Sequence, residues 1–165
     1  TQDELANRLY DWALNPEMLG RILPHAQGRI EMLSDLIPQA AYLLPGELPI
    51  SADAFGESAE TREDVVAQLQ FVSWRLEAQQ DWCREALFAV LKELAEAMSL
   101  KPKVLFAPLF VALSGKAVAY SIPDSMAILG PYMTRARLRR AIEACGGVSK
   151  KAAKRLEKEY AALGL

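Results

Sequence analysis

Apolar residues recur at helical intervals along most of the chain, and few positions alternate with a period of two. After Thr61, for example, Val65, Leu69, Val72 and Leu76 fall on one side of a helix. A half-buried strand needs an apolar residue at every second position, whereas an amphipathic helix needs one at every third or fourth. The pattern therefore predicts an all-α fold.

Capping residues indicate where several of these helices begin and end. Thr61, followed three residues later by Asp64, has the spacing of a helix N-cap, and Ser149 precedes the last predicted helix. Gly146 and Gly147 are predicted to end the helix before it, because glycine readily adopts the left-handed conformation that follows many helices.

The first part of the chain is predicted to hold three helices. One ends near residue 14, a second begins near residue 17, and a third runs from about residue 25 to residue 44. Pro38 lies inside the third and is expected to kink or break it, because proline has no N–H to donate.

The stretch from residue 45 to residue 59 contains prolines, glycines and small or acidic residues, and it predicts an irregular connection. A chain of 165 residues is long enough for one domain or two small ones. We therefore expect two small helical-bundle subdomains, residues 1–58 and 59–165.

Charge is distributed unevenly along the sequence. Residues 1–100 hold 7 Lys and Arg against 17 Asp and Glu, a sum of −10, whereas residues 101–165 hold 12 against 4, a sum of +8. The two sums add to the net charge of −2. Asymmetry of this size points to a polyanion-binding C-terminal part.

The strongest basic cluster lies in a helix predicted to begin at Thr134. Arg135 and Arg139 share one face of that helix, and Arg137 and Arg140 flank it. Guanidinium groups pair with phosphate oxygens, so the cluster favours nucleic acid. The alternative is a solvated helix face that the acidic first part of the chain neutralises.

Aromatic residues near this cluster, and two lysines before it, extend the possible RNA surface. Unpaired RNA bases stack on exposed aromatic rings. We expect core packing for Phe106 and an open position for Tyr120. The other residues of this group are Phe110, Tyr132, Lys103 and Lys116.

Nothing in the sequence predicts catalysis or a metal site. His25 is the single histidine, the two cysteines are too few for a structural zinc site, and no glycine-rich phosphate loop is present. No apolar run approaches the roughly 20 residues of a membrane span. We expect a cytoplasmic monomer, and Thr1 in place of an initiator methionine favours a piece of a longer chain.

Several segments of the chain form a recognisable pattern. They are Ala-Pro-Leu-Phe-Val-Ala-Leu-Ser-Gly-Lys at 107–116, Ile-Leu-Gly at 128–130, the arginine-rich helix at 135–142, Asp-Trp-Cys-Arg-Glu-Ala-Leu at 81–87 and Arg-Ile-Glu-Met-Leu-Ser-Asp-Leu at 29–36. Together these segments resemble the last part of bacterial glutamyl-tRNA synthetases. Their order and spacing agree with the family pattern. The resemblance implies an all-helical anticodon-binding region without the catalytic half, which would use ATP and magnesium.

In that family an arginine at the start of the long helix of the first subdomain reads the third anticodon base. The resemblance places this role on Arg29, which could instead cap its own helix or pair with Asp35 or Glu31. Phe110 stands where the family has an arginine. Ala119-Tyr120 replaces the residues next to the first anticodon base, so Tyr120 is expected to stack instead.

The resemblance therefore implies recognition of the anticodon loop of glutamate tRNA, with the chemistry of a glutamate–tRNA ligase carried elsewhere. The tail 146–165 extends past the usual end of the family and can reach the tRNA backbone or remain solvated. The alternative function is a stand-alone helical protein-interaction domain with a basic docking face. The expected tRNA-binding residues are Arg29, Phe110, Lys116, Tyr120, Arg135, Arg137 and Arg139.

Overall fold

The computed structural model of the chain describes residues 1–13, 16–44, 46, 48–56, 61–117 and 119–165. In these residues the secondary structure consists of α and 3₁₀ helices without a strand, which confirms the all-α prediction. None of the described helices is long and apolar enough to cross a membrane.

The chain divides into two compact units, residues 1–48 and residues 49–165. The predicted subdomain boundary between residues 58 and 59 lies outside the described residues, and that division stays a prediction.

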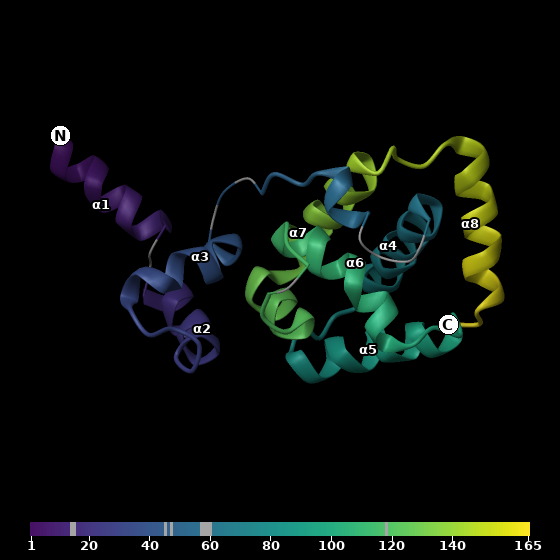
Figure 1. Ribbon diagram of the computed structural model, residues 1–165, viewed down its shortest axis with the longest axis horizontal. Helices are drawn as coiled ribbons and strands as arrows, with labels where there is room; N and C mark the ends of the chain where they lie inside the picture. Colours follow the sequence, from purple (N-terminus) through teal and green to yellow (C-terminus); the bar gives the residue numbers. More distant parts are fainter. Residues whose placement is uncertain (14–15, 45, 47, 57–60, 118) are drawn as a thin grey trace. The chain divides into compact units, whose positions relative to one another are not determined.

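The first unit is built from short helices (Figure 1). They are α1 (Gln2–Ala13), α2 (Pro16–Ala26), a 3₁₀ turn (Leu33–Asp35), α3 (Leu36–Ala40) and a second 3₁₀ turn (Ala41–Leu43). The expected helix from residue 25 to residue 44 is wrong. The Asp35 carboxylate accepts hydrogen bonds from the backbone N–H groups of Glu31 and Met32, at 3.0 and 2.9 Å, and so stabilises a new helix start. Pro38 lies in the first turn of α3, where its missing N–H costs nothing.

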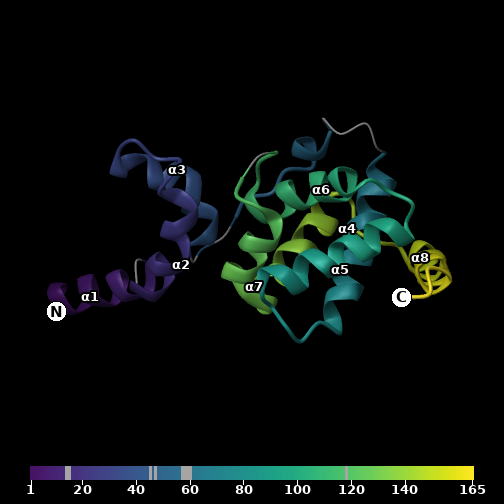
Figure 2. The same cartoon turned by 90° about the horizontal axis from the view of Figure 1, so that it is seen from below.

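The described residues of the second unit form five α helices. They are α4 (Arg62–Glu77), α5 (Arg84–Ala97), α6 (Pro102–Ser114), α7 (Ile122–Ala144) and α8 (Lys150–Ala162), preceded by a 3₁₀ helix (Ala52–Phe55). Helix α7 contacts α4, α5 and α6, whereas α8 packs on α4. Figures 1 and 2 show α8 at the edge of the unit, away from the beginning of α7.

The core of the second unit consists of buried aliphatic side chains from α4 to α7 and Leu156 of α8. An aromatic cluster holds α8 against α4: the ring centroid of Tyr160 lies 5.4 Å from those of Phe71 and Trp74. The C-terminal helix is therefore part of this unit and not a separate tail.

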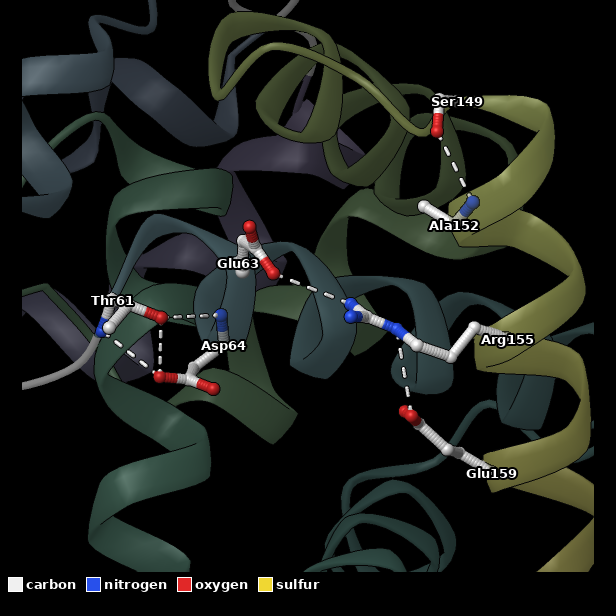
Figure 3. A network of polar contacts seen from close by, with 7 residues as sticks. All are labelled: Thr61, Glu63, Asp64, Ser149, Ala152, Arg155 and Glu159. Carbon is white, nitrogen blue, oxygen red and sulfur yellow. Dashed lines mark hydrogen bonds and ion pairs between the residues drawn. The ribbon is translucent and has the colours of Figure 1, made fainter.

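The predicted helix caps are confirmed. The Thr61 hydroxyl accepts a hydrogen bond from the Asp64 N–H, and the Asp64 carboxylate accepts one from the Thr61 N–H (Figure 3). The Ser149 hydroxyl likewise accepts from the N–H of Ala152. Gly147 donates its N–H to the carbonyl of Ile142 at 2.8 Å and so ends α7.

Gly130 divides α7 into two helical segments. Its backbone has φ 74° and ψ 173°, a conformation open essentially to glycine alone. Pro131 then begins the second segment, since the fixed φ of proline suits the first position of a helix. The expected start at Thr134 is therefore three residues too late, and Thr134 is fully buried.

Arg137 is a buried residue of this core, with 3% of its surface exposed. Its Nη1 donates a hydrogen bond of 2.5 Å to the carbonyl of Leu113. Leu113 lies in the last turn of α6, where carbonyls have no partner within the helix. Arg137 therefore satisfies and closes the end of α6.

We predict that Arg137→Met lowers the free energy of unfolding by about 1–3 kcal/mol, because it leaves a buried carbonyl without its donor. Arg139→Met is the matched control: Arg139 is exposed on the same helix, and its loss should stay within about 0.5 kcal/mol. Urea unfolding followed by tryptophan fluorescence measures both. Equal effects of the two substitutions would contradict the structural role of Arg137.

Candidate nucleic-acid interface

The outer face of the second segment of α7 forms a shallow groove of about 350 Å³. Pro131, Tyr132, Arg135, Ala136 and Arg139 line it. These positions follow one another at helical spacing, so a single helix supplies the whole groove. Pro131, which begins this segment, lies at one end of the groove lining.

Two side chains of this groove are available to a ligand. Tyr132 has 83% of its surface exposed. Arg139 is exposed and forms no hydrogen bond or ion pair with any residue that the structure describes. A phenol ring that bases can stack on thus lies on the same face as a guanidinium that can pair with phosphate. We call Tyr132 and Arg139 the α7 face.

Arg135 lies between Tyr132 and Arg139 on the helix, but its guanidinium already makes hydrogen bonds within the protein. Its Nη2 donates to the carbonyls of Leu76 and Glu77, at 2.7 and 3.4 Å, in the last turn of α4. Its guanidinium carbon also lies 5.8 Å from the centre of the Trp82 ring. A cation at a helix C-terminus interacts favourably with the helix dipole. Arg135 therefore anchors the α7 face more than it offers charge to a ligand.

Two of the predicted RNA-contact residues are placed differently from the expectation. The expected open position of Tyr120 is wrong, because only 2% of its surface is exposed. The expected outward position of Arg137 is also wrong, because it points into the core toward α6. Tyr120 precedes α7 and is buried by tertiary packing. Arg137 shares the buried face of α7 with Thr134, Leu138 and Ala141, at the i, i+3, i+4 and i+7 spacing of one helix face.

The two predicted residues of the α6 region lie in different environments. Phe110 is partly buried and packs against the core, as does Phe106, whose ring meets Phe88 edge to face at 6.4 Å between centroids. Lys116 is exposed, two residues after the end of α6. Phe110 thus has a packing role, and Lys116 lies on the surface.

Arg29 belongs to the first unit and is exposed. It lies in a turn after α2 and not at the start of a long helix, which corrects the expected local structure. Its N–H donates to the carbonyl of Ala26 at 2.8 Å, and its carbonyl accepts from Nε2 of Gln39 at 2.9 Å. These bonds fix the backbone from which the guanidinium extends.

Tyr132 is one of the aromatic residues that the sequence places near the basic cluster, but the expected set of tRNA-binding residues does not include it. It lies three residues before Arg135 and seven before Arg139, which is the spacing of one helix face. The sequence therefore contained the signal, but a helix start at Thr134 left Tyr132 outside the helix. Starting the helix at Pro131 includes it.

Metal binding has no support in the residues that the structure describes, since none of them form a group of three or more His, Cys, Asp or Glu placed to hold an ion. His25 lies in the last turn of α2 and is half-buried. The arrangement suits binding through stacking and charge.

Tyrosine nitration distinguishes the two tyrosines. We predict that Tyr132 is modified well before Tyr120, because a reagent in water reaches the exposed ring and not the buried one. Peptide mass spectrometry at increasing reagent concentration gives the order. Modification of Tyr120 as fast as Tyr132 in the folded chain would contradict the placement.

Comparison with known proteins supports a nucleic-acid role. A family described as an anticodon binding domain matches residues 4–142. The glutamate–tRNA ligases of Cellvibrio japonicus (strain Ueda107) and Marinomonas sp. (strain MWYL1) are 48% and 47% identical over 163 residues. Each alignment covers 99% of this chain and 32% or 33% of the relative. The chain thus spans about a third of the length of these curated relatives.

A solved structure shares the fold. The crystal structure of a glutamate tRNA ligase from Elizabethkingia meningosepticum CCUG26117 aligns with a TM-score of 0.71 at 20% sequence identity, over 79% of this chain and 25% of that chain. The family match includes α1 to most of α7 and ends before α8. Since the match to the family covers most of the sequence, this chain belongs to the anticodon-binding domain family.

Proposed function

We propose that this chain binds the anticodon loop of glutamate tRNA, as the anticodon-binding part of a glutamate–tRNA ligase. The observation that carries the proposal is the α7 face within a domain of the anticodon-binding family. It places an exposed tyrosine beside an exposed arginine that pairs with none of the described residues. The names of the similar ligases support the choice of tRNA.

In this proposal affinity and specificity come from different residues. Arg139 and Lys116 attract the phosphate backbone, and a base of the loop stacks on Tyr132. Arg29 donates from its guanidinium to the acceptors of the third anticodon base, a cytosine in glutamate tRNA. Phosphate contacts position the RNA, while the base contact carries sequence information.

The chemistry of amino-acid attachment would belong to the rest of a longer enzyme. ATP and magnesium would be bound there; among the described residues of this chain, no three His, Cys, Asp or Glu side chains are placed to hold a metal ion. The protein would act as a monomer in the cytoplasm, where tRNA is charged.

Substitution on the α7 face tests the proposal. We predict that Tyr132→Ala weakens binding of an anticodon stem-loop by about 1–3 kcal/mol, the worth of one stacked base. Arg139→Gln should reduce the slope of log Kd against log salt by about 1, because one phosphate contact is lost. Fluorescence anisotropy at several salt concentrations measures both effects.

The matched control for these variants is Lys92→Gln, which removes an exposed charge that pairs with Glu96 on α5. It should leave both quantities unchanged. If the unsubstituted chain fails to bind the stem-loop at low salt, the proposal is wrong and the protein-interaction domain with a basic docking face takes its place.

The proposed base contact of Arg29 is tested by comparing the affinities for two tRNAs. Arg29→Ala should narrow the difference in affinity between glutamate and glutamine tRNAs by about 1–3 kcal/mol, the range for one lost bidentate base contact. The same binding assay with both tRNAs gives the difference. Equal losses for the two tRNAs would show that Arg29 does not discriminate between bases.

A further inference from the structure

A second cationic site lies at the other end of α7, in a cleft of about 460 Å³. The cleft is bounded by the beginning of α4, the turn between α7 and α8, and the first turns of α8. Its charged lining residues are Arg62, Lys151, Arg155 and Glu63. None of these residues belongs to the α7 face.

Three of the four charged residues that line the cleft are positive, and two of the carboxylates that pair with them, Glu159 and Asp53, lie outside its lining. Arg155 lies between two carboxylates, 3.5 Å from Glu63 and 3.6 Å from Glu159 (Figure 3). Arg62 reaches Asp53 only at 4.0 Å, and Lys151 pairs with no carboxylate of the described residues. Exposed ion pairs of this kind contribute about 0–1 kcal/mol each, so an incoming phosphate can replace them.

Arg62 acts electrostatically on the interior of the cleft. Burial raises the pKa of the Cys145 thiol, which lines the cleft, and the charge of Arg62 opposes that shift. The guanidinium therefore influences the space where a ligand would lie, in addition to the surrounding solvent.

The first turn of α8 has the wrong charge for an isolated helix. It holds Lys150 and Lys151 and no acidic residue. The N-terminus of a helix carries partial positive charge, so lysines there are unfavourable without an anion nearby. The first turn of α4, by contrast, follows the rule, because it holds the acidic residues Glu63 and Asp64. Departures from such local rules are expected where a function requires them.

A row of lysines continues from the cleft along α8. Lys151, Lys154 and Lys158 have the i, i+3, i+7 spacing of one helix face. All three are exposed, and none pairs with a carboxylate of the described residues. The row remains on the surface because Leu156 and Tyr160 hold the opposite side of α8 on the core.

The cleft is distant from Tyr132, the stacking residue of the α7 face. Cys145 lies thirteen positions after Tyr132, which corresponds to about 20 Å along a helix that rises 1.5 Å per residue. A phosphate in the cleft therefore belongs to a different nucleotide from a base stacked on Tyr132, and the two contacts can be tested separately.

We propose that this cleft holds a backbone phosphate of the bound RNA, and that the lysine row of α8 contacts the backbone that continues from it. The proposal rests on the proposed RNA-binding function and adds a contact outside the anticodon bases. The Gly146-Gly147 turn leaves room for the ligand, because a Cβ built at either residue would meet nothing within 4 Å.

The test removes the charge of the two cleft residues that are least engaged in ion pairs. In an Arg62→Gln/Lys151→Gln variant, the slope of log Kd against log salt for full-length glutamate tRNA should fall by about 2. The decrease in this slope should be the same for a tRNA with an altered anticodon, because phosphate contacts carry no sequence information. Arg8→Gln/Lys92→Gln is the matched control with the same change in net charge, and its slope should not change.

A footprint on the unsubstituted chain gives a readout that does not depend on folding of the variant. Full-length tRNA should protect Lys151 from acylation, and Lys92 should react equally with and without RNA. Inorganic phosphate at the same phosphate concentration should protect Lys151 much less. An unchanged slope, a loss that depends on the anticodon, or full protection by inorganic phosphate would overturn the cleft proposal. Absence of tRNA binding by the unsubstituted chain would instead overturn the proposed function.

Discussion

Arginine side chains of α7 hold the second unit together by satisfying the open ends of other helices. Arg137 donates to the last turn of α6, and Arg135 donates to the last turn of α4. The final carbonyls of a helix have no intrahelical donor, and a cation also interacts favourably with the helix dipole there. Because α7 contacts α4, α5 and α6, these two bonds fix the helix on which the candidate interface lies.

Because Arg135 and Arg137 bond groups of the protein, the basic C-terminal part offers less charge to a ligand than its sequence suggests. The sum of +8 over residues 101–165 suggests a broad RNA surface, yet two of its arginines act inside the protein. The exposed charge of this part includes Arg139, Lys116 and the lysines of α8. Positive groups therefore lie in two places along the unit, with the exposed ring of Tyr132 at one of them. Such a division suits a nucleic acid that contacts the domain at several phosphates.

The sequence predicted local structure well where a single side chain determines it. Thr61, Ser149 and the Gly146-Gly147 pair each cap a helix as expected, because their hydrogen bonds are local. The predicted start of the basic helix failed because Gly130 interrupts α7 and Pro131 restarts it, which places Tyr132 inside the helix. The burial of Arg137 follows from helix spacing, since Thr134, Leu138 and Ala141 on the same face are also buried. The burial of Tyr120 depends on tertiary packing, which a helical projection does not contain.

Helix α7 thus organises the core with one set of side chains and, in the proposed function, binds RNA with another. Amide chemical-shift mapping of the isotopically labelled chain, titrated with a glutamate anticodon stem-loop, distinguishes the two sets. We expect saturable shifts between Tyr132 and Arg139, with the outer face of α5 (Arg84–Ala97) unchanged. Shifts concentrated on α5, or no saturable shift on α7, would show that α7 does not bind the RNA.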